Sequence, residues 1–424
     1  MNPILDLNEM IPDVEAHVGK DGRLYLYGSM DICGNQAWCS KQYKVFSTDD
    51  LKHWTDHGIS FDTRGDQAGI FKDSVLYAPD CIEKDGTYYL YFCTAPSEKN
   101  RNRGGEGVAV SNTPYGPFQD AVPVLGAHED GIDPAVFIDE DGEAYLYWGQ
   151  HQLRGAKLKS NMREIDEATV NRNIIDEERF GFHEGSSMRK RNGIYYLVYA
   201  DDSSGRPTRL SYVMGNSPLG PFDHKGIIVD NLGCDPEAWN NHGSIVEYHG
   251  QWYVFYHRHT MNSRYNRRVC VEPIRFLEDG SIERVEMTTQ GVDGPIAPEQ
   301  RMEAGRACKL GAGAFIERKG NEEWIHVVHD GDSALYRYYC FDGTSRKFVA
   351  AVEGARRQGK IEIRLGHEAG TLLGICEIPV CEEENQRVIC TCDVKQAEGV
   401  EALCLVFRGS GENLYRVLNF WFTS

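Results

Sequence analysis

Residues 131–149, GIDPAVFIDEDGEAYLYWG, decide the fold of this chain. An apolar run is followed by the turn letters EDG and then by an aromatic run that alternates at a period of two. This is the pattern of a tight β-hairpin. The carboxylate of Asp133 stands immediately before the first strand, although the strand pair itself is apolar.

Four other stretches repeat the same pattern. They read DVEAHVGKDGRLYLYGS from Asp13, PDCIEKDGTYYLYFCT from Pro79, EGSSMRKRNGIYYLVYA from Glu184 and NHGSIVEYHGQWYVFYH from Asn241. The equivalent aromatic residues are Tyr25, Tyr89, Tyr145, Tyr196 and Tyr253. Their spacing of about 50–65 residues suits four-stranded propeller blades with long loops. The repeats therefore predict a five-bladed β-propeller; the alternative is a pair of β-sandwiches with chance similarity.

The aromatic pattern ends at residues 292–310, VDGPIAPEQRMEAGRACKL, which reads as a linker rich in Pro and Gly. Short strands such as KFVAAVEG, GKIEIRLG and EALCLVFRG follow as far as Ser424. Their number and spacing predict a β-sandwich of jelly-roll type. We therefore expect an all-β chain with a propeller over residues 1–297 and a sandwich over residues 298–424.

The composition limits the possible partners and the compartment. Lys and Arg total 45 against 64 Asp and Glu, which gives a net charge of −19. This charge disfavours binding to nucleic acid or anionic membranes, but it is compatible with a neutral sugar as ligand. The thirteen cysteines show no CxxC spacing, as expected of buried thiols in a reducing compartment. The first residues do not resemble a signal peptide. These features predict a cytoplasmic protein.

Three carboxylates occupy one equivalent position in three different repeats. Asp13, Asp133 and Glu184 each precede the aligned Tyr by 12 residues. The same count gives Tyr77 in the second repeat, with Asp80 three residues later, and Asn241 in the fifth, with His242 beside it. The first strand of each blade lines the axis of a propeller, so equivalent positions should form a ring at one depth.

A ring of carboxylates suits the hydrolysis of glycosidic bonds. One protonated acid serves the leaving oxygen, and one ionised partner activates water from the opposite side. A separation of about 6.5–9.5 Å between the two admits that water and inverts the anomeric centre. The alternative for the three carboxylates is a structural or ion-binding role.

The first 295 or so residues resemble family 43 glycoside hydrolases, which are five-bladed propellers. The resemblance rests on IPDVEAHV, YAPDCIEKDGTYYLYF, GIDPAVFIDEDGEAYLYWG, HEGSSMRKRNGIYYLVYA and NHGSIVEYHGQWYVFYHRH, in that order. It implies an inverting enzyme in which Asp13 is the general base, Asp133 orients and tunes the acid, and Glu184 is the general acid. One departure is that Val follows Asp13 where the family often has Pro.

The resemblance also implies further site residues. His242 matches an axial residue that helps to hold calcium or another cation, and Arg267 or Arg268 matches a basic residue that reaches the substrate. We further expect Asp80 and Trp148 to contact substrate, and Trp38 is a second candidate for stacking on a sugar ring. No cofactor is expected for the chemistry, and a structural calcium ion is expected near His242, in the sandwich domain, or in both.

The C-terminal part resembles family 6 carbohydrate-binding modules through QRMEAGRACKL, GKIEIRLGHEAGTLLGICEIPV and LCLVFRGSGENLYRVLNFWF. Asn413 matches a sugar-binding Asn of those modules, and Glu303 is a candidate ligand for their structural calcium. Val327 and Asn385 take the places of the two aromatic residues that would hold sugar. We therefore expect a domain that mainly supports the propeller, with Trp324 directed towards the mouth of the active site.

The resemblance implies an exo-acting hydrolase that releases terminal α-L-arabinofuranosyl groups from oligosaccharides of plant xylan or arabinan. A β-D-xylosidase, or an enzyme with both activities, is the first alternative, because the two sugars are similar around the reacting carbon. A non-catalytic carbohydrate-binding propeller and a scaffold for protein partners are further alternatives. The expected partner is an oligosaccharide that contains arabinose or xylose, and the sequence leaves the oligomeric state open.

Overall fold

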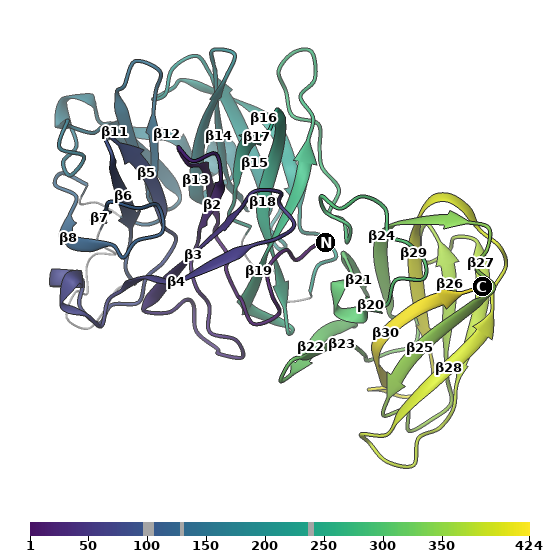
Figure 1. Ribbon diagram of the computed structural model, residues 1–424. Coiled ribbons are helices and arrows are strands. Elements are labelled where there is room, and N and C mark those ends of the chain that lie inside the picture. Colours follow the sequence, from purple (N-terminus) through teal and green to yellow (C-terminus); the bar gives the residue numbers. More distant parts are fainter. Residues whose placement is uncertain (96–105, 128–130, 236–240) are drawn as a thin grey trace.

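The structure is a computed structural model that describes residues 1–95, 106–127, 131–235 and 241–424. Strands dominate both of its parts, a group of radiating sheets built from the N-terminal residues and a two-layered body built from the C-terminal residues (Figure 1). The expected all-β class is confirmed. The short helices in the described residues are η1 (Asp66–Phe71), η2 (Glu167–Thr169), α1 (Glu177–Phe180) and η3 (Ala304–Arg306). No helix in the described ranges is long and apolar enough to cross a membrane.

The first part contains five antiparallel sheets in chain order. The first two blades are β1 (Glu15–Val18), β2 (Leu24–Tyr27), β3 (Gln42–Thr48), β4 (Thr55–Asp62), and β5 (Asp80–Lys84), β6 (Thr87–Phe92), β7 (Gly107–Ser111), β8 (Gln119–Pro123). The third is β9 (Ala135–Ile138), β10 (Ala144–Trp148), β11 (Gln152–Lys157), β12 (Asn171–Asp176). The last two are β13 (Phe182–Arg191), β14 (Ile194–Asp201), β15 (Arg209–Gly215), β16 (Phe222–Asp230), and β17 (Ser244–Tyr248), β18 (Gln251–Thr260), β19 (Ser263–Ile274).

The first strands of the five sheets close a ring. β1 contacts β5, β5 contacts β9, β9 contacts β13, β13 contacts β17, and β17 returns to β1. Each sheet then runs outwards in sequence order, which is the arrangement of propeller blades. The predicted five-bladed propeller is confirmed.

The N-terminal residues complete the fifth blade, which has three strands of its own. The backbone N–H of Ile4 donates to the carbonyl of Val269 on β19 at 3.1 Å. Asn2 is fully buried; its Oδ1 accepts from the N–H of Val271 and its amide donates to Glu272. The start of the chain therefore joins the last blade and helps to close the ring.

The second part is a sandwich of two antiparallel sheets. One contains β22 (Phe315–Lys319), β23 (Glu322–Val327), β30 (Tyr415–Thr423), β25 (Lys347–Glu353) and β28 (Arg387–Asp393), with β20 (Met302–Glu303) beside β30. The other contains β21 (Lys309–Gly311), β24 (Ser333–Asp342), β29 (Glu398–Arg408), β26 (Gly359–Leu365) and β27 (Leu372–Ile378). Aromatic rings between the sheets form the core. The predicted β-sandwich is confirmed.

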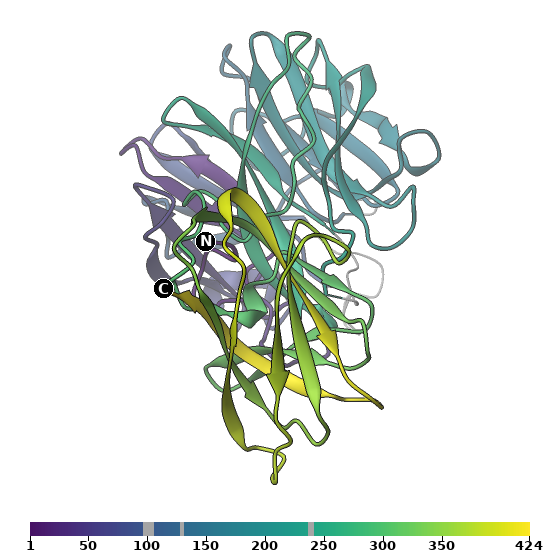
Figure 2. The same ribbon diagram turned by 90° about the vertical axis from the view of Figure 1, so that its right-hand side faces the viewer.

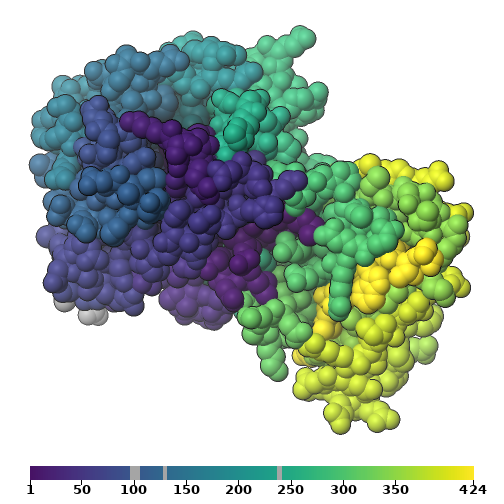
Figure 3. Space-filling model, viewed as in Figure 1, coloured from purple at the N-terminus to yellow at the C-terminus, as the bar shows by residue number. Residues whose placement is uncertain are grey.

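The chain crosses between the two domains over residues 275–301. Val285 still bridges to Val229 of the propeller, whereas Ile296 bridges to Tyr339 and lies in the sandwich core. Contacts with the propeller therefore extend to at least residue 285, and contacts with the sandwich begin by residue 296. Figure 2 shows the sandwich in front of the propeller sheets, and Figure 3 shows the two domains in direct contact.

All thirteen cysteines are free thiols, and most are buried. This agrees with the expectation drawn from their spacing.

Candidate active site

The three equivalent carboxylates converge on one cavity at the propeller axis. Asp13 and Asp133 immediately precede β1 and β9, and Glu184 lies at the start of β13. All three residues are buried, with at most 8% of their surface exposed. The cavity has a volume of about 410 Å³ and is lined by Asp13, Trp38, Cys39, Tyr77, Ala78, Ile132, Asp133, Gln150, His183, Glu184, His242 and Arg267.

The backbone at these positions has an unusual conformation. Asp13 and Asp133 have φ angles of 57° and 54°, which side-chain-bearing residues rarely adopt. Gly185, next to Glu184, has φ 64°, and a Cβ there would lie 2.7 Å from the ring of His242. Only glycine fits that position without displacing the imidazole. The blades therefore direct these side chains inward at a local cost in backbone strain.

Asp13 is surrounded by basic groups. Arg267 Nη1 donates to both of its carboxylate oxygens, at 2.8 and 3.1 Å, and His257 Nδ1 lies 3.5 Å from Oδ1. Burial acts to raise the pKa of Asp13, but the opposing influences, of which the charge of Arg267 is the largest, outweigh it and the pKa is lowered. Asp13 is thus held as a carboxylate, the form that can take a proton from water.

Asp133 has the opposite electrostatic environment. Burial, then the charge of Glu184, then that of Asp13 raise the pKa of Asp133 well above its usual range. Gln150 Nε2 donates to Glu184 Oε2 at 2.9 Å and fixes that carboxyl group. Coupled carboxyls in a buried site favour one shared proton over two charges. Asp133 and Glu184 can therefore share one proton, while Asp13 stays ionised.

His242 lies between the two aspartates. Its Nδ1 is 3.9 Å from Asp13 Oδ1 and 3.9 Å from Asp133 Oδ2. The two oxygens are consequently within twice that distance of each other. Burial is the largest influence on the imidazole and lowers the pKa of His242, despite the charge of Asp13. Burying the neutral imidazole costs less here than burying an imidazolium would.

The two consecutive arginines of β19 point in opposite directions, as alternate residues of a strand do. Arg267 lines the cavity and also bonds Asp31, whose oxygens accept from Nε and Nη2 at 2.9 Å each. Arg268 instead pairs with Glu323 of the sandwich at 3.0 Å. Of the two candidates for substrate contact, the structure brings only Arg267 to the cavity.

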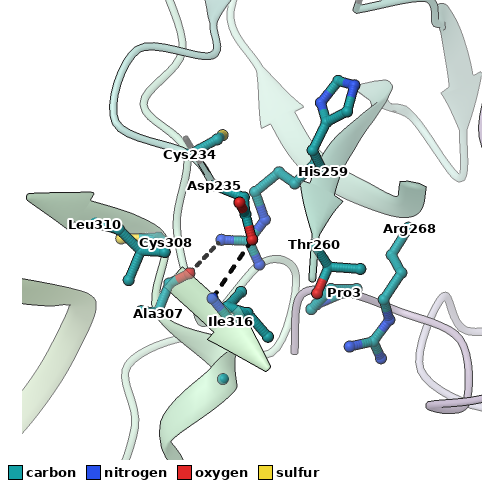
Figure 4. Close-up of a pocket in the computed structure, with 12 residues that line it drawn as sticks. Pro3, Cys234, Asp235, His259, Thr260, Arg268, Ala307, Cys308, Leu310 and Ile316 are labelled. Carbon is teal, nitrogen blue, oxygen red and sulfur yellow. Dashed lines mark hydrogen bonds between the residues drawn. The ribbon is translucent and has the colours of Figure 1, made fainter. Parts of the chain in front are cut away.

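Arg268 borders a small void between the domains, shown in Figure 4. The void has a volume of about 10 Å³, the room of roughly one water molecule. Across it, Arg258 donates to the carbonyl of Ala307 and Asp235 accepts from the backbone of Ile316. This region joins the domains and has no room for a sugar.

Two expected substrate contacts are corrected by the structure. Trp148 is 2% exposed and packs in the core between the second and third blades, so it presents no face to a sugar. Asp80 is fully buried on β5; it lies 2.6 Å from His17 Nε2 on β1 and accepts from the N–H of Val136 on β9. Asp80 therefore ties three inner strands together.

The cavity residues Tyr77, Gln150 and His183 were not among the expected catalytic or substrate-binding residues. Tyr77 holds the position given by the 12-residue count in the second repeat, so the repeat alone could have identified it. Gln150 follows β10, and His183 precedes the general-acid candidate; no sequence signal marked either. Trp38, the second candidate for stacking, lines the cavity and its ring lies 4.7 Å from the guanidinium carbon of Arg267.

The expected calcium sites gain little support from the side chains present. Glu303 is 59% exposed on its side chain and lies 3.4 Å from Arg306, and a single such carboxylate is a poor calcium site. Of the two carboxyl groups nearest His242, that of Asp13 already accepts hydrogen bonds from Arg267. Among the described residues, the groups of three metal-ligating side chains are Glu15, His17, Asp80 and His151, Glu177, His183.

The sandwich lacks the aromatic platforms of a sugar-binding cleft at the expected positions. Val327 is fully buried in the core, and Asn413 Oδ1 lies 3.2 Å from His326 Nε2. Trp324 is 4% exposed and donates to Glu317, so it does not project towards the active site as expected.

Comparison with known proteins places these features in a family context. The profile of glycosyl hydrolases family 43 matches residues 1–282, and that of carbohydrate binding module family 6 matches residues 310–424. A xylosidase/arabinosidase of Thermoclostridium stercorarium is 32% identical over 97% of this chain and 96% of its own. An arabinoxylan arabinofuranohydrolase of Bacillus subtilis (strain 168) is 28% identical over 97% of this chain and 91% of its own. The crystal structure of a β-xylosidase/α-arabinofuranosidase from a compost microbial metagenome, in complex with xylotriose, is similar with a TM-score of 0.57 and 31% identity, covering 67% of this chain and 97% of that chain.

Proposed function

This chain belongs to glycosyl hydrolases family 43, and we propose that it removes terminal α-L-arabinofuranosyl groups from plant cell-wall oligosaccharides with inversion of configuration. The observation that carries the proposal is the convergence of Asp13, Asp133 and Glu184 on one cavity, with opposite electrostatic surroundings for the two aspartates. Hydrolysis by this family needs no cofactor for its chemistry.

The mechanism follows from these surroundings. Asp13, ionised beside Arg267, takes a proton from a water molecule, whose oxygen attacks the anomeric carbon. The bond from that carbon to the leaving oxygen breaks, and Glu184 gives the leaving oxygen its proton. Asp133 lies beside Glu184 and influences how the proton is held between them. The amide of Gln150 holds the carboxyl group of Glu184 in place, and His242 lies between Asp13 and Asp133.

A β-D-xylosidase activity remains the main alternative, because the similar proteins carry both names. Two relatives that match nearly the whole chain are named for arabinose release, one as a xylosidase/arabinosidase and one as an arabinoxylan arabinofuranohydrolase, which favours the arabinofuranosidase. The direct comparison is hydrolysis of 4-nitrophenyl α-L-arabinofuranoside and 4-nitrophenyl β-D-xylopyranoside. A ratio of kcat/KM in favour of the arabinofuranoside supports the proposal, and the reverse ratio makes the chain a xylosidase.

The role of Glu184 is tested with Glu184→Gln. We expect kcat on alkyl or aryl glycosides with poor leaving groups to fall by at least about 10²-fold, the scale of general acid catalysis. The loss should be smaller with a 2,4-dinitrophenyl leaving group, which needs no proton. Glu140→Gln, on an exposed hairpin turn of the third blade, is the control and should keep parental activity. Parental activity in Glu184→Gln would exclude Glu184 as the acid.

A further inference from the structure

A second cluster of ionisable side chains lies directly beside the cavity. His151 stands in the turn before β11, Glu177 begins α1, and His183 lies on β13 next to Glu184. Asp202 follows β14, and its carboxylate approaches the imidazole of His183. The catalytic scheme above uses none of these four residues.

The cluster has the dimensions of a metal site. His151 Nδ1 is 2.9 Å from one oxygen of Glu177, and His183 Nδ1 is 3.8 Å from the other. One ligand atom from each of the three residues lies within 4.8 Å of the others. Ligands on a tetrahedral zinc ion, with bonds of about 2.0–2.2 Å, stand roughly 3.3 Å apart. The three side chains need only small adjustments to surround such an ion.

The backbone already holds these residues together. The N–H of His151 donates to the carbonyl of His183 at 2.7 Å, and the N–H of Glu177 donates to the carbonyl of His151 at 2.9 Å. Segments from three places in the sequence are thus fixed to one another before any ligand binds. Such preorganisation reduces the entropy lost on binding.

The charges of the cluster favour a cation. Asp202 Oδ2 lies 3.3 Å from His183 Nδ1 and near Glu177, so two carboxylates share a small region. A bound cation would relieve the repulsion between the two carboxylates.

We propose that His151, Glu177 and His183 form a binding site for a divalent transition metal ion of the zinc class, with Asp202 as a neighbouring fourth residue that brings a second carboxylate. Two imidazole nitrogens favour Zn²⁺, Co²⁺ or Ni²⁺, whereas Ca²⁺ and Mg²⁺ prefer a shell of oxygen atoms. The site is separate from the axial residues Asp13 and Asp133. It lies on the Nδ1 side of His183, whose Nε2 is 4.0 Å from Glu184.

The same contacts would arise if both imidazoles were protonated and paired with the carboxylates, so the test must measure the metal itself. Full-length protein without an affinity tag, freed of metal by chelation, is titrated with Zn²⁺ by calorimetry and with Co²⁺ by visible absorption. We expect one site, and visible Co²⁺ bands typical of tetrahedral coordination. Ca²⁺ at the same concentration should not displace Co²⁺.

Two variants locate the site. His151→Ala and Glu177→Gln, both partly exposed, should each weaken Zn²⁺ binding by at least about ten-fold. His53→Ala is the matched control, because His53 is an exposed imidazole that also contacts a carboxylate, Asp50, and it should bind Zn²⁺ like the parent. Failure to bind Zn²⁺, displacement of Co²⁺ by Ca²⁺, or unchanged affinity in both site variants would overturn the proposal.

Discussion

The residues of the active site are set by local backbone geometry as much as by their own chemistry. Asp13 and Asp133 share a left-handed conformation immediately before their inner strands, at positions that the repeat makes equivalent. The same conformation gives different chemistry, because Asp13 meets Arg267 whereas Asp133 meets Glu184. Two identical side chains thus have pKa values moved in opposite directions.

The first residue-scale prediction concerns pH. Arg267 lowers the pKa of Asp13, so Arg267→Met should raise it and leave less of the carboxylate form in acid. The acidic limb of the profile of kcat/KM against pH should move upwards by at least about one unit. Arg267→Lys, which keeps the charge, should move it less. Arg275→Met, at an exposed ion pair with Glu283, should not move it; an acidic limb that stays in place in Arg267→Met would contradict the role given to Arg267.

The second residue-scale prediction concerns Gly185. Gly185→Ala places a methyl group against His242 and keeps a positive φ, so Glu184 and the imidazole should be displaced together. We expect kcat to fall by about ten-fold or more, because small misplacements of catalytic groups are costly. Gly142→Ala is the matched control, since Gly142 has φ 83° in a hairpin turn with open space around it. If the two variants have equal kcat, the contact with His242 does not matter.

The sequence located the three carboxylates of the cavity better than it located their surroundings. Counting 12 residues back from an aligned Tyr located Asp13, Asp133 and Glu184, and also Tyr77, because the repeat fixes depth along the axis. The sequence did not distinguish Arg267 from Arg268, because that choice depends on which face of β19 is turned towards the cavity. It also placed Trp148 in the site, although packing between blades buries that ring.

At the scale of elements, β19 links the active site to the second domain. Arg267 on one face bonds Asp13, and Arg268 on the other pairs with Glu323 of β23. Both members of the Arg268–Glu323 pair are almost completely buried, and Thr260 of β18 also donates to Glu323. Hairpin repeats predicted the strands themselves, but these contacts join segments far apart in the sequence, so no local pattern could indicate them. The structural role of Asp80 between β1, β5 and β9 escaped prediction for the same reason.

The buried Arg268–Glu323 ion pair should contribute to the stability of the folded protein. Arg268→Met leaves the charge of Glu323 buried without its partner and should lower the free energy of unfolding by about 3–5 kcal/mol. The double variant with Glu323→Gln should recover part of that loss, because both charges are then removed. Chemical denaturation measures both. Arg275→Met, at an exposed pair, should cost about 1 kcal/mol or less, and equal losses in Arg268→Met and Arg275→Met would show that the interdomain pair contributes little.

At the scale of the whole molecule, the sandwich supports the propeller through β19 and the N-terminal residues. Arg306 donates to the carbonyl of Pro3, and Arg318 donates to the carbonyl of Leu7 and the side chain of Asn8. The first residues of the chain also complete the fifth blade. The prediction of a supporting domain came from aromatic residues that are missing at two positions, whereas the contacts between the domains are visible only in three dimensions.

The most direct test of the central claim is the configuration of the first-formed sugar, followed by ¹H NMR during hydrolysis of 4-nitrophenyl α-L-arabinofuranoside or of the xyloside if that is the better substrate. Asp13 as base and Glu184 as acid, with water between them, predict that the anomer opposite to that of the substrate appears first. If the anomer of the substrate appears first, a covalent intermediate forms and the roles assigned to Asp13 and Glu184 are wrong.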